Sequence, residues 1–331
     1  MKRLDRLSGN NFLVIGRAGM DFFPDPAGTK IRDAVEFSSG LGGSSANIAV
    51  AICKLGGQAA LVTTVSDDAV GEYCRQQLQN YGVSTDHVRT ITGEARTSLA
   101  VYESRIEGHQ TVIYRNNAAD FQMDLQDVDA PDYARFSGLI TTGTVFAAEP
   151  SRSAGYRALE HARSAGLPVI FDIDYRPYSW TSAELASDVL TKAAEMSDII
   201  IGNDEEFDFV AGAPGMGLSL ARRLGQSPDR IIVYKLGPGG SITFAENRAF
   251  GTGIYRVEAL KPTGAGDSFM GAFIASLAAG LDLPDCVARG SANAAIVVSR
   301  PGCAPAMEDA AGLDAFIASH AGLSRPPEIP V

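Results

Sequence analysis

The amino-acid sequence predicts an α/β fold: a doubly wound, mainly parallel sheet flanked by helices, with a small β-sheet lid. Two observations support this prediction. Apolar runs of strand length recur along the chain, and each lies near a segment with helical periodicity, as in successive β–α–β units. Two further segments alternate polar and apolar residues with no helix between them, which is typical of a half-exposed sheet.

The length and composition indicate one large globular domain. The chain has 331 residues, of which 45% are hydrophobic and 20% are charged, so it is long enough to bury a full-sized core. We expect a single domain over residues 1–323. The proline-rich end, residues 324–331, is expected to be a flexible tail.

The predicted elements alternate along most of the chain. Helices between strands imply right-handed crossovers and a buried parallel sheet, so ligands are expected at the carboxyl ends of the strands. The expected strands are NFLVIG (11–16), AALVTTV (59–65), FSGLITTG (136–143), LPVIFDID (167–174), DIIIGN (198–203) and RIIVYKLG (230–237). The expected helices include SSANIAVAICKLGG (44–57), AVGEYCRQQLQNYG (69–82), SRSAGYRALEHARSAG (151–166) and TSAELASDVLTKAAEMS (181–197).

The alternating segments IRDAVEFSSG (31–40) and TSLAVYESRIEGHQTVIYRNN (97–117) predict the lid. Its strands are expected at about residues 29–39 and 97–116, inserted in the larger domain and closing on substrate. Because unpaired strand edges invite pairing, a homodimer through the lid is one hypothesis. The segment 240–260 predicts a hairpin at the edge of the main sheet.

Charge and cysteine usage exclude several classes of partner. The net charge of −11 provides no basic field for nucleic acid or an anionic membrane. The four cysteines show no C-x-x-C spacing and the four histidines are far apart, so no zinc site is indicated. No apolar run approaches a signal-peptide core or the roughly 18 residues of a membrane span, and we expect a cytoplasmic protein with reduced thiols.

The stretch GAGD places Gly264, Ala265 and Gly266 directly before Asp267, where an apolar helix pattern begins. Asp267 could simply cap the helix. Alternatively, the small residues leave backbone N–H groups free for an anion, and the acid beside them acts as a base, as phosphoryl transfer requires. The motif by itself leaves both interpretations open.

Other loops after strands are candidates for nucleotide and metal binding. GSSAN (43–47) fails the spacing of a dinucleotide-binding loop, and no G-x-x-x-x-G-K-[ST] occurs. In NDEE, Asn203 and Glu206 either order a metal or cap a helix. YKLGPGGS (234–241) offers Gly237 and Gly240 for close approach to a nucleotide, or forms a plain hairpin turn.

Polar residues on the acceptor side suit a sugar or sugar acid. Asp21 and Asn47 offer short acceptors for hydroxyls, whereas Arg115 and Arg176 suit a carboxylate through bidentate hydrogen bonds. Each of these residues is also compatible with an ordinary surface position.

Two of these segments together resemble a known family. GGSSANIAVAICKLG (42–56) resembles the N-terminal signature, and PTGAGDSFMGAF (262–273) the C-terminal signature, of the ribokinase-like sugar kinases, the PfkB family. The resemblance implies the ribokinase-like fold, ATP as phosphoryl donor and a requirement for Mg2+. For catalysis it implies Asp267 as the base, with Gly264, Ala265 and Gly266 as the anion hole, and Asn203 and Glu206 for ordering Mg2+ indirectly. The residues implied for the nucleotide are Lys235, Gly237, Gly240 and Asn293. Those implied for the sugar are Asp21, Gly42, Gly43 and Asn47.

Within the family, YRNNAAD (114–120) and DYRPYSW (174–180) look like the kinases of 5-dehydro-2-deoxygluconate in myo-inositol breakdown. This resemblance implies phosphorylation of the terminal hydroxyl to the 6-phosphate, with Arg115 and Arg176 facing the substrate carboxylate. A 2-keto-3-deoxygluconate kinase or a fructokinase is the alternative, and a non-catalytic sugar-binding regulator ranks below both. Lys261 stands where many family members carry an acid two positions before the Thr, although this subfamily tolerates Lys there. Glu308 replaces the usual Pro after Met307, in a region that often holds a monovalent cation, so a requirement for K+ is left open.

Overall fold

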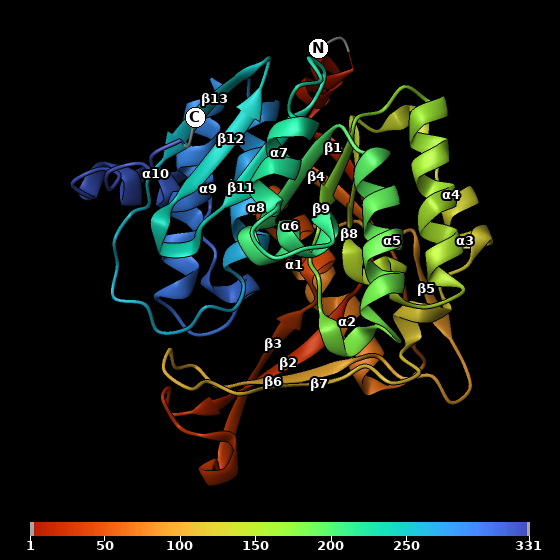
Figure 1. Cartoon of the computed structure of the whole chain (residues 1–331). Helices are drawn as coiled ribbons and strands as arrows, with labels where there is room; N and C mark the ends of the chain where they lie inside the picture. The colour runs from red at the N-terminus through yellow and green to blue at the C-terminus, as the bar shows by residue number, and fades with distance from the viewer. Residues whose placement is uncertain (1–2, 330–331) are drawn as a thin grey trace.

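The structure, a computed structural model, describes residues 3–329 of the chain. Within this range a nine-stranded sheet runs through the molecule (Figure 1). Its strands are parallel from β11 to β5, and β12 is antiparallel to both neighbours, which confirms the α/β prediction. The strands, in spatial order, are β13 (Arg248–Thr252), β12 (Ser241–Ala245), β11 (Ile231–Lys235), β10 (Ile199–Asn203), β9 (Val169–Asp172), β8 (Gly138–Thr142), β1 (Asn11–Ile15), β4 (Gln58–Ser66) and β5 (Val88–Ile91).

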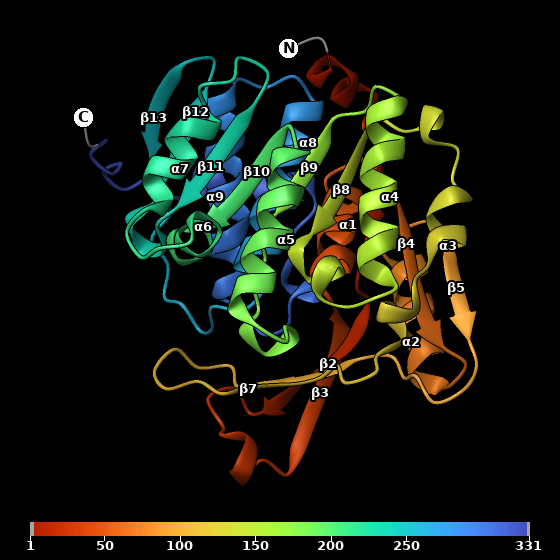
Figure 2. The same cartoon turned by 45° about the vertical axis from the view of Figure 1, so that its right-hand side comes forward.

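Helices cover both faces of this sheet because its central strands are apolar on both sides. On β1, Phe12 and Val14 enter one core while Leu13 and Ile15 enter the other, and all four are fully buried. Figure 2 shows α4 and α5 in front of the sheet and α8 and α9 behind it. One face carries α1 (Ser44–Lys54), α2 (Ala69–Asn80), α8 (Ala265–Ala278) and α9 (Leu283–Val298), with α10 (Ala310–Ser319) packed on α9; the other carries α3 (Leu125–Asp129), α4 (Ser151–Ser164), α5 (Ala183–Glu195), α6 (Asp204–Ala211) and α7 (Gly217–Leu224).

Short 3-10 helices connect these elements. They are η1 (Leu4–Gly9), η2 (Ile31–Asp33), η3 (Ala119–Gln122), η4 (Tyr133–Arg135), η5 (Gly143–Ala147), η6 (Pro177–Ser179), η7 (Gly237–Gly239) and η8 (Ala304–Ala306). Among the described residues, no helix is both long enough and apolar enough to cross a membrane.

A separate four-stranded sheet lies at the bottom of the view in Figure 1. Its order is β3 (Glu36–Gly42), β2 (Gly19–Asp25), β6 (Leu99–Tyr102) and β7 (Thr111–Tyr114). The structure differs from the expected lid strands in two respects: residues 31–33 form a 3-10 turn, and β2 joins the sheet. The pairing of β2 with β6 is parallel and connects distant segments, so no local alternation signals it.

The described part of the C-terminal segment lies beside the end of β13. The backbone N–H of Ser324 donates to the carbonyl of Ile254 at 2.8 Å, and the N–H of Ile254 donates to Ser324 Oγ at 3.0 Å. Residues 330 and 331 lie outside the described residues. The flexible tail over 324–331 therefore stays a prediction.

The helices α1 and α8 pack closely at one glycine. A Cβ atom at Gly271 would lie 2.2 Å from the Cβ of Ala51, so a larger residue would push the two helices apart. This close contact brings two helices from opposite ends of the chain together, and their N-termini lie in one region at the carboxyl ends of the strands.

Candidate functional site

The N-terminus of α8 presents its backbone amides without a side-chain cap. Gly264 precedes the helix with φ of +83°, and a Cβ there would lie 2.8 Å from Cys303 Sγ, so both backbone and packing favour glycine. Among residues 3–329, the Asp267 side chain makes no hydrogen bond to a backbone amide at this helix start. Its Oδ2 instead accepts a hydrogen bond of 2.8 Å from Asn47 Nδ2 on α1. The capping interpretation of GAGD is therefore wrong for the side chain of Asp267.

The N-terminus of α1 meets this carboxylate because of a glycine turn. Gly43 has φ of +100°, and a Cβ there would lie 2.3 Å from the carbonyl oxygen of Arg17. Asn47 follows in the first turn of α1 and is 3% exposed. Its Oδ1 has no hydrogen-bond partner among the described residues, so one acceptor remains free beside Asp267.

Asp21 on β2 is a second buried acceptor. It is 1% exposed, and a Cβ at Gly42 would come within 1.9 Å of its Oδ1, so only glycine leaves room for this carboxylate. Oδ1 has no hydrogen-bond partner among residues 3–329. Burial raises the pKa of Asp21 to about 7, although Arg17 lowers it. An unpaired buried acceptor of this kind suits the hydroxyl of a ligand.

Carboxylates that the sequence reasoning missed lie at the end of β9. Burial raises the pKa of Asp172 to about 8, against the effect of Lys235. Asp174 has φ of +37°, and its Oδ2 accepts from Ser44 Oγ at 2.7 Å. The signal for them was available: FDID places two acids directly after a buried strand. The position of these two acids in the sequence does not indicate that they lie near Asp267.

Negative charge thus accumulates around Asp267. Burial raises the pKa of the Asp267 carboxyl, and Asp174 raises it further. The hydrogen bond from Asn47 and the charges of Arg176 and Lys235 act in the opposite direction. The carboxylate is consequently easier to protonate than an ordinary aspartate, which is the property a general base needs.

Asn203 and Glu206 form a capping box at the start of α6. Asn203 Oδ1 accepts from the Glu206 N–H, and Glu206 Oε2 accepts from the Asn203 N–H, both at 2.8 Å. The other oxygen, Glu206 Oε1, lies 3.8 Å from Arg176 Nη1. The capping interpretation holds, and it leaves Oε1 outside the capping box. Among residues 3–329, no cluster of three or more His, Cys, Asp or Glu side chains could hold a metal by itself.

The two arginines assigned from sequence have different surroundings. Arg176 Nη2 lies 2.8 Å from Asp174 Oδ1, and its side chain is 46% exposed. Arg115 is buried, with Nη2 lying 2.5 Å from Asp120 Oδ2 and its guanidinium 4.1 Å from the centroid of the Phe121 ring. Each arginine is thus paired with a carboxylate; Arg176 is partly exposed at the carboxylate cluster, whereas Arg115 is buried with its partner.

The residues assigned to the nucleotide lie on both sides of α8. Lys235 ends β11, and its Nζ would be 3.4 Å from a Cβ at Gly266, so it reaches the first turn of α8. Gly237 opens the exposed turn after β11, and Gly240, with φ of +94°, closes it. Asn293 is fully buried on α9, and its Nδ2 donates to the carbonyl of Ser268 at 2.9 Å. In the structure Asn293 links α9 to α8.

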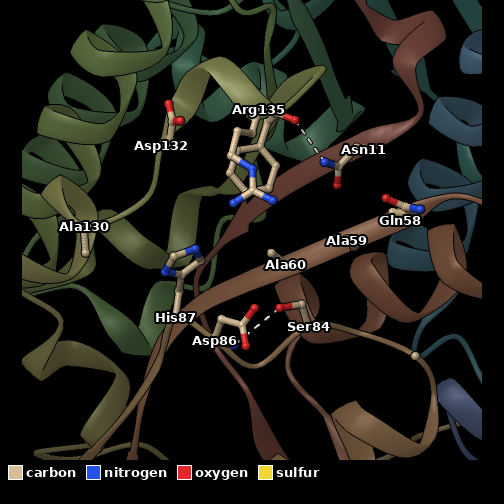
Figure 3. A pocket seen from close by; sticks show the side chains of 12 residues that line it. Asn11, Gln58, Ala59, Ala60, Ser84, Asp86, His87, Ala130, Asp132 and Arg135 are labelled. Carbon is tan, nitrogen blue, oxygen red and sulfur yellow. Dashed lines mark hydrogen bonds between the residues drawn. The ribbon is translucent and has the colours of Figure 1, made fainter.

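A hollow of about 560 Å³ lies at the opposite end of the sheet (Figure 3). It is lined at the amino ends of β1 and β4 by Asn11 and Gln58, together with Asp86, His87 and Arg135. Ligands of open α/β sheets bind at the carboxyl ends, so this hollow is separate from the candidate site.

The unusual pKa of Asp21 predicts how the stability depends on pH. Asp21 ionises near 3.8 in an unfolded chain and near 7 in the fold, so its ionisation destabilises the fold increasingly as the pH rises between these values. We expect Asp21→Asn to be more stable than wild type at pH 8, with an advantage that shrinks on acidification and disappears below about pH 4.

Urea unfolding midpoints at pH 4, 6 and 8 measure this difference. The exposed Asp285→Asn, in the first turn of α9, controls for the loss of one negative charge. An advantage of Asp21→Asn that is the same at all three pH values would contradict the assignment.

The amino-acid sequence is similar to those of known sugar kinases. It matches the model of the pfkB family of carbohydrate kinases over residues 10–310. The 5-dehydro-2-deoxygluconokinase of Photobacterium profundum is 41% identical over 300 residues, which span 89% of this chain and 91% of that protein. The 5-dehydro-2-deoxygluconokinase of Geobacillus kaustophilus is 34% identical over 315 residues, spanning 94% of each.

Solved structures share the fold. The fructokinase of Xylella fastidiosa with bound ATP superposes with a TM-score of 0.81 at 23% identity, covering 94% of this chain and 98% of that one. A double mutant of the Vibrio cholerae fructokinase, bound to fructose, ADP and a potassium ion, gives a TM-score of 0.82 at 25% identity, covering 93% and 98%. The family match, the relatives and the shared fold agree with the geometry of the site, and the chain belongs to the pfkB family of carbohydrate kinases.

Proposed function

We propose that this kinase transfers the γ-phosphoryl group of ATP to the terminal hydroxyl of 5-dehydro-2-deoxy-D-gluconate, forming the 6-phosphate in myo-inositol catabolism. The observation that carries the proposal is the pairing of Asn47 with Asp267 beside the uncapped amides of α8. The names of the relatives at 34–41% identity support the choice of acceptor.

Asp267 is the proposed base. Asn47 donates to its Oδ2, which leaves Oδ1 to take the proton from the acceptor hydroxyl. The hydroxyl oxygen then forms a bond to the γ-phosphorus as the bond to the β,γ-bridging oxygen breaks, releasing ADP. The amides of Gly264, Ala265 and Gly266 are proposed to hold the negative charge of the transferring group, because they lie at the positive end of the helix dipole.

The remaining residues of the proposed site bind the two substrates. We propose Asp21, Gly42, Gly43 and Asn47 for the sugar hydroxyls, and Arg176 for orienting the acceptor. Arg115 is retained as a proposed acceptor residue, although its pairing with Asp120 makes an indirect contribution through the lid the simpler role. Lys235 suits the phosphates of the nucleotide, Gly237 and Gly240 suit its base and ribose, and Asn293 supports this side by holding α8.

The surplus of carboxylates fits a divalent cation that arrives with the nucleotide. The charges of Glu206 and Asp174 both raise the pKa of Asp172, and added positive charge would relieve this repulsion. When bound, Mg2+ would neutralise charge on the phosphates. Glu206 Oε1, which lies outside the capping box, and the neighbouring Asn203 would order the water around the ion rather than bind it directly.

The position of Lys261 suggests whether the enzyme needs a monovalent cation. Its side chain is fully buried, and Nζ donates to the carbonyls of Thr263 at 2.7 Å and Val297 at 3.0 Å, directly before the anion hole. We infer that this ammonium supplies the positive charge that a bound K+ would supply there. Solvent K+ is then not required.

Replacing Asp267 tests the base. We expect Asp267→Asn to lower kcat by about 10²- to 10⁴-fold while ADP still binds, because the amide keeps the shape but cannot accept a proton. The measurement is ADP release in a coupled assay, with Asp285→Asn as control. In wild type, kcat/KM should fall on acidification through a pKa above that of an ordinary aspartate, since burial raises the pKa of Asp267. Retained turnover in the variant would remove Asp267 as base.

A panel of acceptors tests the substrate. We expect the highest kcat/KM with 5-dehydro-2-deoxygluconate, and lower values with 2-keto-3-deoxygluconate, fructose and ribose, because the site carries cationic side chains for an acid. The readout is ADP formation with ATP and Mg2+. A preference for fructose would mean that the substrate is a neutral sugar rather than a sugar acid. If the protein binds these compounds but phosphorylates none of the four, a sugar-binding regulator is favoured.

Cation exchange tests the role of Lys261. Wild-type kcat/KM should be the same in K+ and in tetramethylammonium. The Lys261→Ala variant should lose activity and regain part of it with NH4+, which matches the lost group in charge and size. An increase of several-fold in the wild-type rate on adding K+ would overturn this inference.

A further inference from the structure

Arg17 is a buried arginine that the sequence reasoning did not assign. It follows β1 and is 7% exposed. Its carbonyl accepts from the N–H of Ala46 at 3.2 Å, which attaches it to the first turn of α1. Arg17 is therefore held at the carboxyl end of a central strand, on the same helix terminus that carries Asn47.

The guanidinium of Arg17 packs closely against the first residue of β2 and makes few hydrogen bonds. Nη1 donates to Ser98 Oγ at 2.8 Å, and a Cβ at Gly19 would lie 2.7 Å from the same nitrogen, so glycine leaves space for it. Within residues 3–329 no carboxylate lies within 4.0 Å of this guanidinium. An arginine has five N–H donors in a fork that matches a carboxylate.

The other two arginines near the site, unlike Arg17, each have a carboxylate within ion-pair distance. Arg115 is balanced by Asp120 at 2.5 Å, and Arg176 by Asp174 at 2.8 Å. A buried charge without a direct partner is costly to the fold, and proteins keep such charges where they have a function. Burial by itself lowers the pKa of Arg17, but Tyr102 and Asp21 raise it, and the side chain stays charged.

Arg17 and Asp21 lie on the same face of the four-stranded sheet. A Cβ at Gly19 would meet Arg17 Nη1, and a Cβ at Gly42, the residue paired with Gly19 across β2 and β3, would meet the Asp21 carboxylate. Both Arg17 and Asp267 act electrostatically on the Asp21 carboxyl, whereas the charges that act on Asp267 most strongly are those of Asp174, Arg176 and Lys235. The unpaired oxygens Asp21 Oδ1 and Asn47 Oδ1 lie at the same site. An acceptor with a hydroxyl at Asp267 and hydroxyls along Asp21 would carry its opposite end toward Arg17.

We propose that Arg17 binds the carboxylate of the acceptor and makes this enzyme select a sugar acid over a neutral sugar. The proposal rests on the proposed function and adds the residue that recognises the acid. Arg176 then positions the acceptor near the reacting hydroxyl, and Arg17 reads the opposite end of the molecule.

The test compares 5-dehydro-2-deoxygluconate with its uncharged carboxamide on wild type, Arg17→Met and Arg17→Lys. Arg75→Met, in which an arginine bonded to the backbone carbonyls of Thr85 and Val88 is removed, is the matched control. Arg17→Met should lower kcat/KM for the acid by at least about 30-fold, mainly through KM, because a buried charge pair is lost. Its kcat/KM for the carboxamide should stay within about threefold, and Arg75→Met should alter neither.

The outcomes separate this inference from the proposed function. Turnover of the acid by wild type tests the function, and the change in the acid-to-carboxamide ratio tests Arg17. An equal loss on both substrates, or no loss on either, overturns the inference. Wild type that prefers the carboxamide overturns both. ADP affinity and melting temperature report folding; if Arg17→Met does not fold, Arg17→Lys should still lower the ratio about tenfold, since an ammonium cannot form the bidentate pair.

Discussion

The hydrogen bond between Asn47 and Asp267 is the interaction on which the site depends. It joins the first turns of α1 and α8, two helices separated by most of the chain, and it orients the carboxylate away from the capping position. The bond forms because Gly271 lets the two helices approach and because Gly43 and Gly264 take the left-handed conformations that begin each helix. Backbone geometry therefore places a carboxylate, the proposed base, next to uncapped amides.

The carboxylates of the site repel one another and are only partly balanced by cationic side chains. Burial and mutual repulsion raise the pKa values of Asp21, Asp172 and Asp267, while Lys235, Arg17 and Lys261 offset part of the charge. A fold selected only for stability would not keep this many carboxylates out of water. Ligands that bring hydroxyl donors and cations relieve the repulsion, so the same groups that destabilise the empty site favour binding.

The signatures at residues 42–56 and 262–273 were sufficient to predict the fold and the family, because they lie at helix starts where local sequence decides the backbone. They also suggest the proposed base, Asp267. The arginines were harder to place. Arg115 lies in a motif that was expected to face the substrate, yet its guanidinium forms an ion pair with Asp120, five residues away. The residues around Arg17 in the sequence do not indicate that its side chain is buried without a carboxylate beside it.

The sequence by itself determined the alternation of strands and helices, the glycine turns and the identity of the carbohydrate kinase family. These features depend on periodicity, on φ preferences and on motifs contained in short segments. Only the tertiary structure decided which side chains meet: that β2 joins β6, that Asp172 and Asp174 approach Asp267, and that Lys261 is enclosed by backbone carbonyls. Such contacts depend on how distant segments pack, and a one-dimensional pattern does not encode the distance between them.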